Sequence, residues 1–156
     1  MKYLLIFVTL SFCICGNQSC IRDHECKDVA PVDEQAQILA YVGSNGITAT
    51  AHSSGLYYQV ITPGSGTAPT ATSTVTVKYT GKLASTNAVF DQQTAAPVVI
   101  PLQDVIDGWK IGLPLIRKGG YIKLVIPSAL GYGCSGLGVI PPNSVIYFEI
   151  ELIDVQ

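Results

Sequence analysis

The chain has 156 residues, a length that suits one domain with additional residues at an end and is enough to bury a substantial core. Its formal net charge is −2 and only 13% of its residues are charged, so there is no electrostatic basis for a nucleic-acid partner or an anionic membrane surface. The 15 glycines and 9 prolines favour turns over long helices, as in a β-rich fold.

The N-terminus has the pattern of an export signal. Residues 1–3 form a short basic region, and residues 4–15 form an apolar stretch that is too short to span a bilayer as a helix. We expect residues 1–19 to be a signal peptide that is cleaved, and we leave them out of the predicted fold.

Two cleavage schemes fit this signal. Cys20 follows the apolar stretch with a small residue before it, as in bacterial lipoprotein signals, although Asn17 stands where such signals carry an aliphatic residue. Alternatively, Cys13–Cys15 is the site of an ordinary signal peptidase, and the product is a freely soluble exported protein. We favour lipidation at Cys20, which predicts a protein of the periplasm or cell envelope that meets the membrane only through its lipid anchor.

The remaining cysteines leave two interpretations open. If Cys20 carries lipid, Cys26 and Cys134 remain, and in an oxidising compartment they can form a disulfide; two free thiols are the equal alternative. His24 and Cys26 form an H-x-C motif, but two neighbouring ligands near a terminus are weak grounds for a metal site. We interpret the segment as a solvated tether and expect no bound metal.

The region 20–54 is predicted to be this tether followed by one short helix. Asp33 has the residue type of an N-cap, and apolar residues with helical spacing follow it. Gly-Ser-Asn-Gly at 43–46 ends the helix after two to three turns. The small and polar residues at 48–54 predict a linker.

From residue 55 onwards the pattern is that of strands around one helix. Alternating, β-branched and aromatic residues predict strands at Leu56–Thr62, Val75–Tyr79, Val98–Leu102, Ile122–Ile126 and Val145–Leu152. A helix ended by Pro114 is predicted between them, with one apolar face formed by Val105, Ile106, Trp109 and Leu113. We therefore predict an α+β domain over residues 55–156, in which an antiparallel β-sheet wraps one short α-helix.

Two classes of site are not supported. Residues 131–136 match the G-x-G-x-x-G pattern of dinucleotide-binding loops, which requires a helix directly afterwards to hold the pyrophosphate. Val-Ile-Pro-Pro at 139–142 cannot begin that helix, so a nucleotide site is rejected. His52 is the only histidine besides His24, so no Ser-His-Asp or Cys-His arrangement can form inside the domain, and hydrolase chemistry is not expected.

A set of short motifs remains. They are Val-Lys-Tyr-Thr-Gly at 77–81, Phe-Asp at 90–91, Val-Ile-Asp-Gly-Trp at 105–109, Gly-Tyr-Gly at 131–133 and Ile-Pro-Pro-Asn-Ser at 140–144. With Phe148 of the last strand, they supply a set of aromatic and aliphatic groups with one carboxylate, Asp91, and two phenols, Tyr79 and Tyr132. Such a set can desolvate a small apolar group and offer it a few hydrogen bonds. In this order and spacing the motifs resemble the FKBP-type peptidyl-prolyl cis/trans isomerases, over residues 55–155.

The resemblance implies an FKBP-like fold with a proline-binding pocket. By this resemblance Trp109 forms the pocket floor and Asp91 lies at its edge. The Tyr132 hydroxyl and the Ile106 backbone N–H are expected to donate hydrogen bonds to substrate carbonyls. The other substrate-binding positions that the resemblance implies are Tyr79, Phe90, Val98, Val105, Ile140 and Phe148.

The chain also departs from the family at the pocket rim. Val98 stands where the family often has a phenylalanine that closes one wall, and the segments 101–104 and 134–138 are shorter than usual. These departures bear on substrate preference and on the affinity for macrolides more than on the basic activity.

The resemblance implies a peptidyl-prolyl cis/trans isomerase, or rotamase, that speeds X–Pro isomerisation in exported proteins without a cofactor. Its expected partners are proline-containing polypeptides, with macrolides as candidate ligands. The N-terminal helix is shorter than the helical region with which related exported isomerases dimerise, so we expect a monomer. The alternative is an FKBP-fold chaperone or binding module with little catalysis.

Overall fold

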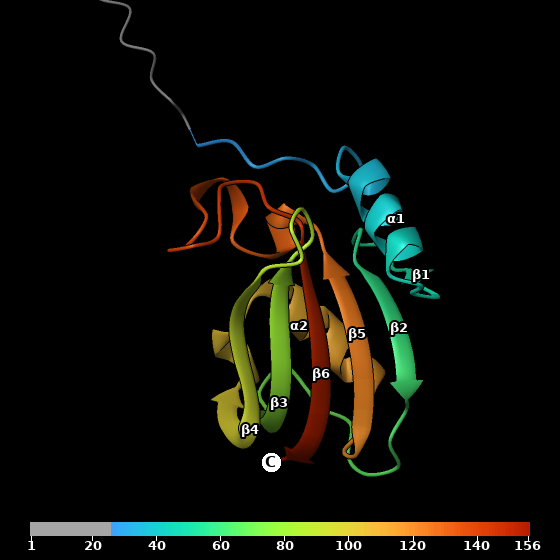
Figure 1. Ribbon diagram of the computed structural model, residues 1–156. Helices are drawn as coiled ribbons and strands as arrows, with labels where there is room; N and C mark the ends of the chain where they lie inside the picture. Colours follow the sequence, from blue (N-terminus) through green and yellow to red (C-terminus); the bar gives the residue numbers. More distant parts are fainter. Residues whose placement is uncertain (1–25) are drawn as a thin grey trace, which may run out of the picture.

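One antiparallel sheet organises the part of the chain that the computed structural model describes, residues 26–156 (Figure 1). Its six strands lie in the order β1-β2-β5-β6-β3-β4. The strands are β1 (Thr50–Ala51), β2 (Tyr57–Thr62), β3 (Thr74–Leu83), β4 (Val89–Pro101), β5 (Gly120–Ile126) and β6 (Ile146–Val155). The α-helices are α1 (Gln35–Ser44) and α2 (Asp107–Gly112), and short 3₁₀ helices span Leu102–Asp104, Leu113–Leu115, Ser128–Leu130 and Gly133–Ser135. The predicted α+β fold is confirmed.

The two faces of the sheet carry separate cores, because successive side chains of a strand point to opposite faces. In Figure 1, α2 lies behind the sheet and α1 lies beside β1 and β2 at one end of it. The larger core is on the α2 side and includes Val75, Val77, Trp109, Leu124, Ile126, Phe148, Ile150 and Leu152. The smaller core joins α1 to the opposite face through Ile38, Tyr41, Ile47, Tyr57, Val125, Val145 and Tyr147.

Glycines let α2 lie close to β5. A Cβ atom on Gly108 would lie 2.6 Å from Cγ2 of Ile126, and one on Gly112 would lie 2.7 Å from both methyl carbons of Leu124. Ile126 and Leu124 are fully buried, so they cannot move aside. This close approach fixes the height of Trp109 above the sheet.

The start of α1 differs from the prediction that Asp33 caps it. Asp33 lies in the preceding turn, where its backbone N–H donates to the carbonyl of Ala30, and the helix begins at Gln35. Glu34 is buried instead of sitting in an exposed first turn, because its carboxylate accepts a 2.7 Å hydrogen bond from the backbone N–H of Ser128.

The predicted linker at 48–54 is wrong in its middle. Thr50 and Ala51 form β1 and pair with Tyr58 and Tyr57 of β2. An exposed edge strand needs no apolar side chains, so the small polar residues gave no periodic signal for it. The predicted solvated tether also differs in its described part, residues 26–32. This segment is joined to the loop after β5, because Cys26 forms a disulfide with Cys134.

β4 is longer than the predicted strand Val98–Leu102. It begins at Val89 and includes the exposed residues 92–97, Gln-Gln-Thr-Ala-Ala-Pro, while Leu102 belongs to the 3₁₀ helix that follows. The pairing with β3 shifts between Val77, which faces Val98, and Tyr79, which faces Gln93, so the residues between them bulge from the sheet edge. Because these residues are exposed, no apolar alternation marks this half of the strand.

The predicted helix face is only partly helical. Val105 and Ile106 have extended backbones and precede α2, and Leu113 belongs to the next 3₁₀ helix. The α-helix ends just before Pro114, as predicted: α2 stops at Gly112 with Leu113 as its C-cap, and Pro114 lies in the 3₁₀ turn that follows. Among residues 26–156, no helix is both long enough and apolar enough to cross a membrane.

We expect Gly108→Ala to lower the free energy of unfolding by about 1–3 kcal/mol, because the added methyl group would overlap Ile126. Gly43→Ala is the matched control: Gly43 lies in α1 with nothing within 4 Å of the new Cβ, so the change should be neutral or stabilise by up to about 1 kcal/mol. Urea unfolding midpoints measure both. A Gly108→Ala protein as stable as the control would contradict the close packing of α2 against β5.

Candidate functional site

A pocket of about 220 Å³ opens between α2, the sheet and the loop after β5. Its lining residues are Tyr79, Asp91, Ile100, Asp104, Val105, Ile106, Trp109, Tyr132 and Phe148. They come from β3, β4, β6, α2, the segment that leads into α2, and the loop that contains Tyr132. The volume is at the small end for ligand sites, so it suits one ring-sized group rather than a large molecule.

Three aromatic rings form the floor of this pocket. Trp109 is 4% exposed and packs edge-to-face against Tyr79 and against Phe148, with ring centroids 5.2 Å apart in both pairs. Edge-to-face pairs of this kind fix the ring orientation as well as burying apolar area. The floor is therefore rigid and apolar before any ligand enters.

Phe90 supports the lining from behind. Its ring packs edge-to-face against Phe148 at 5.5 Å and against Tyr132 at 6.4 Å. Both phenylalanine rings cover Gly81, where a Cβ atom would lie 2.6 Å from Phe148 and 2.8 Å from Phe90. Phe90 thus holds two lining rings in place without itself lining the pocket.

A hydrogen bond at the rim joins β3 to β4. The Tyr79 hydroxyl donates to Oδ2 of Asp91 at 2.6 Å. Burial, and secondly this hydrogen bond, raise the pKa of the Tyr79 phenol above its usual value. Burial, and secondly the charge of Asp91, also raise the pKa of Tyr132. Both phenols are therefore neutral hydrogen-bond donors at physiological pH.

Three polar groups in or beside the pocket have no partner within residues 26–156. Nε1 of Trp109 is buried without a hydrogen bond. The Tyr132 hydroxyl and the backbone N–H of Ile106, at the start of α2, donate no hydrogen bond within the described chain. The first N–H groups of a helix have no intrahelical acceptor, so Ile106 is free to donate to a ligand.

The structure brings most of the predicted site residues together. Tyr79, Asp91, Val105, Ile106, Trp109, Tyr132 and Phe148 all line the pocket, although their roles toward a substrate stay predictions. Val98 does not line it; Val98 packs against the larger core, opposite Val77 in the β3–β4 pair. Ile140 does not line it either, since it is buried in a turn where it exchanges two backbone hydrogen bonds with Leu137.

Sequence reasoning missed two lining residues. Ile100 lies two positions after Val98, so strand alternation puts it on the same face and one step nearer the pocket. That alternation was visible in the sequence. Asp104 ends the 3₁₀ helix just before Val105, and it adds a second carboxylate to the rim. In the sequence, only the adjacency of Asp104 to Val105 indicated that it would line the pocket.

Other hollows lack comparable chemistry. A wider one of about 430 Å³ lies between the start of α1 and the β1–β2 turn, but its lining contains no aromatic floor and His52 is already hydrogen-bonded to Ser54. Within residues 26–156, no group of three or more His, Cys, Asp or Glu side chains is placed to hold a metal ion. His24, half of the H-x-C motif, lies outside the described residues.

Comparisons with known proteins agree with this geometry. Residues 65–153 match the family described as FKBP-type peptidyl-prolyl cis-trans isomerase. The FKBP-type peptidyl-prolyl cis-trans isomerase FkpA of Escherichia coli K12 is 47% identical over 105 residues, which cover 67% of this chain and 39% of that protein. A probable FKBP-type isomerase of Haemophilus influenzae is 47% identical over 106 residues, covering 66% and 44%. The chain thus spans less than half the length of these curated relatives.

Solved structures give the same result. The crystal structure of FkpA from E. coli superposes with a TM-score of 0.71 at 41% identity, over 81% of this chain and 61% of that one. A peptidyl-prolyl cis-trans isomerase from Pseudomonas syringae superposes with a TM-score of 0.70 at 34% identity, over 81% and 93% of the two chains.

The raised phenol pKa values predict a loss of stability in alkali. A tyrosine in the unfolded chain ionises near pH 10, whereas the buried Tyr79 and Tyr132 keep their protons to higher pH. Above about pH 10 the unfolded state therefore holds fewer protons, and the free energy of unfolding must fall as the pH rises. Tyr79→Phe removes one such group and should flatten this decline. Urea midpoints measured from about pH 8 to pH 12 test it; identical slopes for both proteins would contradict it.

Proposed function

We propose that this chain, which belongs to the FKBP-type peptidyl-prolyl cis-trans isomerase family, catalyses the cis–trans isomerisation of X–Pro bonds in polypeptides. The observation that carries the proposal is the pocket itself. It combines a rigid aromatic floor around Trp109 with two free hydrogen-bond donors, at Tyr132 and Ile106. It suits a proline ring with a peptide carbonyl on either side.

The chemistry needs no nucleophile. Rotation about an amide has a barrier of about 18–20 kcal/mol, because resonance gives the C–N bond partial double-bond character. An X–Pro bond populates both isomers but exchanges slowly. Twisting removes the resonance and its charge separation, so an apolar, water-excluding pocket favours the twisted bond over the planar one.

The rim would orient the peptide around the twisting bond. In our proposal Trp109 holds the proline ring, and the Tyr132 hydroxyl and the Ile106 N–H donate to carbonyls that flank it. Asp91 is fixed by the Tyr79 hydroxyl at the pocket edge, where its negative charge faces the imide. No bond of the substrate is made or broken, so no cofactor takes part.

We also propose export and lipid attachment at Cys20. The support is the signal-like segment 1–19 and the disulfide between Cys26 and Cys134, since structural disulfides persist in oxidising compartments. Residues 1–25 themselves lie outside the described structure. The clients would then be proline-containing proteins of the periplasm or cell envelope. Metabolic labelling with a fatty acid tests this: label on the wild type and none on Cys20→Ser is expected, and an unlabelled, released wild type would contradict it.

The alternative function is an FKBP-fold chaperone or binding module. One observation favours it: Leu137 and Val139, at the tip of the loop after Tyr132, are 62% and 73% exposed. Apolar side chains held in water can contact unfolded polypeptides. Suppression of client aggregation that persists undiminished in a Trp109→Leu protein, the pocket variant with the larger expected loss of isomerase activity, would support this alternative. For either function we propose that the protein is a monomer. We also propose that macrolides bind the pocket in competition with proline-containing peptides.

We expect Tyr132→Phe to lower kcat/KM for a short X–Pro peptide by about two- to tenfold, the value of one neutral hydrogen bond. Trp109→Leu should lower it by more than about tenfold, because the ring that receives proline is lost. Tyr121→Phe is the matched control, since Tyr121 lies on the sheet face opposite Trp109 and outside the pocket lining. A coupled peptide assay measures all three, with circular dichroism to verify folding. Full activity in both pocket variants would refute the site.

A further inference from the structure

The first described segment of the chain is bound to the loop that carries Tyr132. We call residues 26–34 the N-terminal strap and residues 128–135 the Tyr132 loop. The strap makes one covalent bond to the loop, the disulfide Cys26–Cys134, whose Cα atoms are 5.3 Å apart. The bond joins residues separated by 108 positions in the chain.

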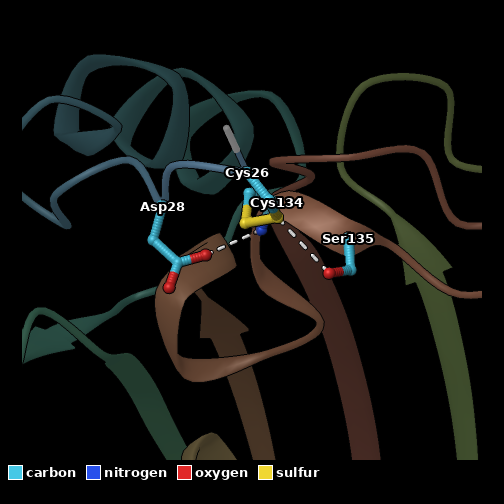
Figure 2. The surroundings of a disulfide bond; sticks show 4 residues. All are labelled: Cys26, Asp28, Cys134 and Ser135. Atoms are coloured by element: carbon cyan, nitrogen blue, oxygen red, sulfur yellow. Dashed lines mark hydrogen bonds between the residues drawn. A yellow bond between two sulfur atoms is a disulfide. The ribbon is translucent and has the colours of Figure 1, made fainter. Parts of the chain in front are cut away.

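Two carboxylates of the strap bind the backbone of the same loop. Asp28 accepts a 2.7 Å hydrogen bond from the N–H of Cys134, next to the disulfide (Figure 2). Glu34, which is buried, accepts a 2.7 Å hydrogen bond from the N–H of Ser128. The strap therefore holds the loop on both sides of Tyr132, once before it and twice after it.

The strap also lies directly against the backbone beside Tyr132. Gly133 has a φ of +57°, and a Cβ atom there would lie 2.5 Å from Oδ1 of Asp28. Only glycine permits this approach. The side chain of Ser135 contacts Sγ of Cys26 at 3.4 Å (Figure 2). Movement of the strap therefore reaches the residue next to Tyr132 without any intermediate side chain.

The disulfide is the contact of the strap that chemistry can remove reversibly. Cys26 is exposed, so a reductant can reach it, and Asp28 is exposed as well. Without the covalent bond, the strap end would be held to the loop by the Asp28 hydrogen bond and the long Cys26–Ser135 contact, both of which are exposed to water. The loop would keep its own hydrogen bond from the Gly131 N–H to the Ser128 carbonyl and the one that its Gly133 carbonyl accepts from the Asn143 N–H, so it would loosen rather than unfold.

We propose that the Cys26–Cys134 disulfide is a positioning device for Tyr132, and that its reduction lowers the catalytic efficiency of the isomerase. This rests on the function proposed above. The reductant is a dithiol, either a small molecule or a thiol–disulfide oxidoreductase. It transfers two electrons and two protons: the Cys26–Cys134 S–S bond breaks, two thiols form, and the dithiol becomes a disulfide.

The test compares oxidised protein with protein reduced by dithiothreitol, with thiol alkylation and mass spectrometry to verify each state. Reduction should lower kcat/KM by about two- to tenfold, less than the ~10²-fold that a 1 Å displacement of a catalytic group can cost. The double variant Cys26→Ser, Cys134→Ser should have the reduced rate in both conditions. Circular dichroism at the assay temperature verifies that every sample is folded.

Tyr132→Phe distinguishes positioning from general loosening. If the disulfide acts through the Tyr132 hydroxyl, the variant has already lost what reduction removes, and its rate should be the same in both redox states. An equal fractional loss in Tyr132→Phe and in the wild type would overturn the route through Tyr132. An unchanged wild-type rate after complete reduction would overturn the proposal.

A binding readout separates this inference from the proposed function. Trp109 is the only tryptophan of the chain and forms the pocket floor, so its fluorescence reports ligand entry. If no isomerase activity exists, a proline peptide that binds more weakly to the reduced wild type, but equally to both states of Tyr132→Phe, still supports the positioning role. Equal peptide affinity in both redox states of an inactive wild type would overturn it.

Discussion

The edge-to-face packing of Trp109 against Tyr79 and Phe148 connects the core of this protein with its pocket. The three rings come from α2, β3 and β6, so the pocket floor exists only when the helix lies on the sheet at the correct height. That height is set by Gly108 and Gly112, which bring α2 against Ile126 and Leu124. Stability and function are thus not separable here: changes that lift the helix also tilt the ring on which a substrate would rest.

The strands that bury apolar side chains were predictable from the sequence, because burial leaves a periodic pattern of apolar residues. Alternation in Val75–Tyr79 and in Ile146–Leu152 places every second side chain in the larger core, and both segments lie in strands of the structure. The exposed half of β4, before Val98, and the two-residue β1 could not be found in this way. Their side chains are exposed, and only backbone pairing with β3 and β2 makes them strands. A pattern of side chains cannot report a hydrogen bond between backbones.

The site residues were predictable where they belong to one contiguous motif. They were less predictable where their position depends on how a strand lies in the sheet. Trp109, Ile106 and Val105 come from one short motif, and the structure keeps them together. Val98 was expected in the pocket, but Ile100, two residues further along β4 on the same face, lines it instead. The pairing of Cys26 with Cys134 was likewise beyond the sequence, because it depends on where the strap crosses the loop and not on any local pattern.

The bulge in β4 affects whether other polypeptide chains can pair with the edge of the sheet. β4 is the last strand of the sheet, and an exposed edge offers free backbone groups to any extended polypeptide. Between the two paired halves of β4 the register slips, and Pro97, which has no N–H to donate, lies in the slipped part. A second polypeptide therefore cannot form a continuous ladder of backbone hydrogen bonds along β4. For the activity proposed above, such an edge would keep incompletely folded polypeptides from pairing with the protein's own sheet.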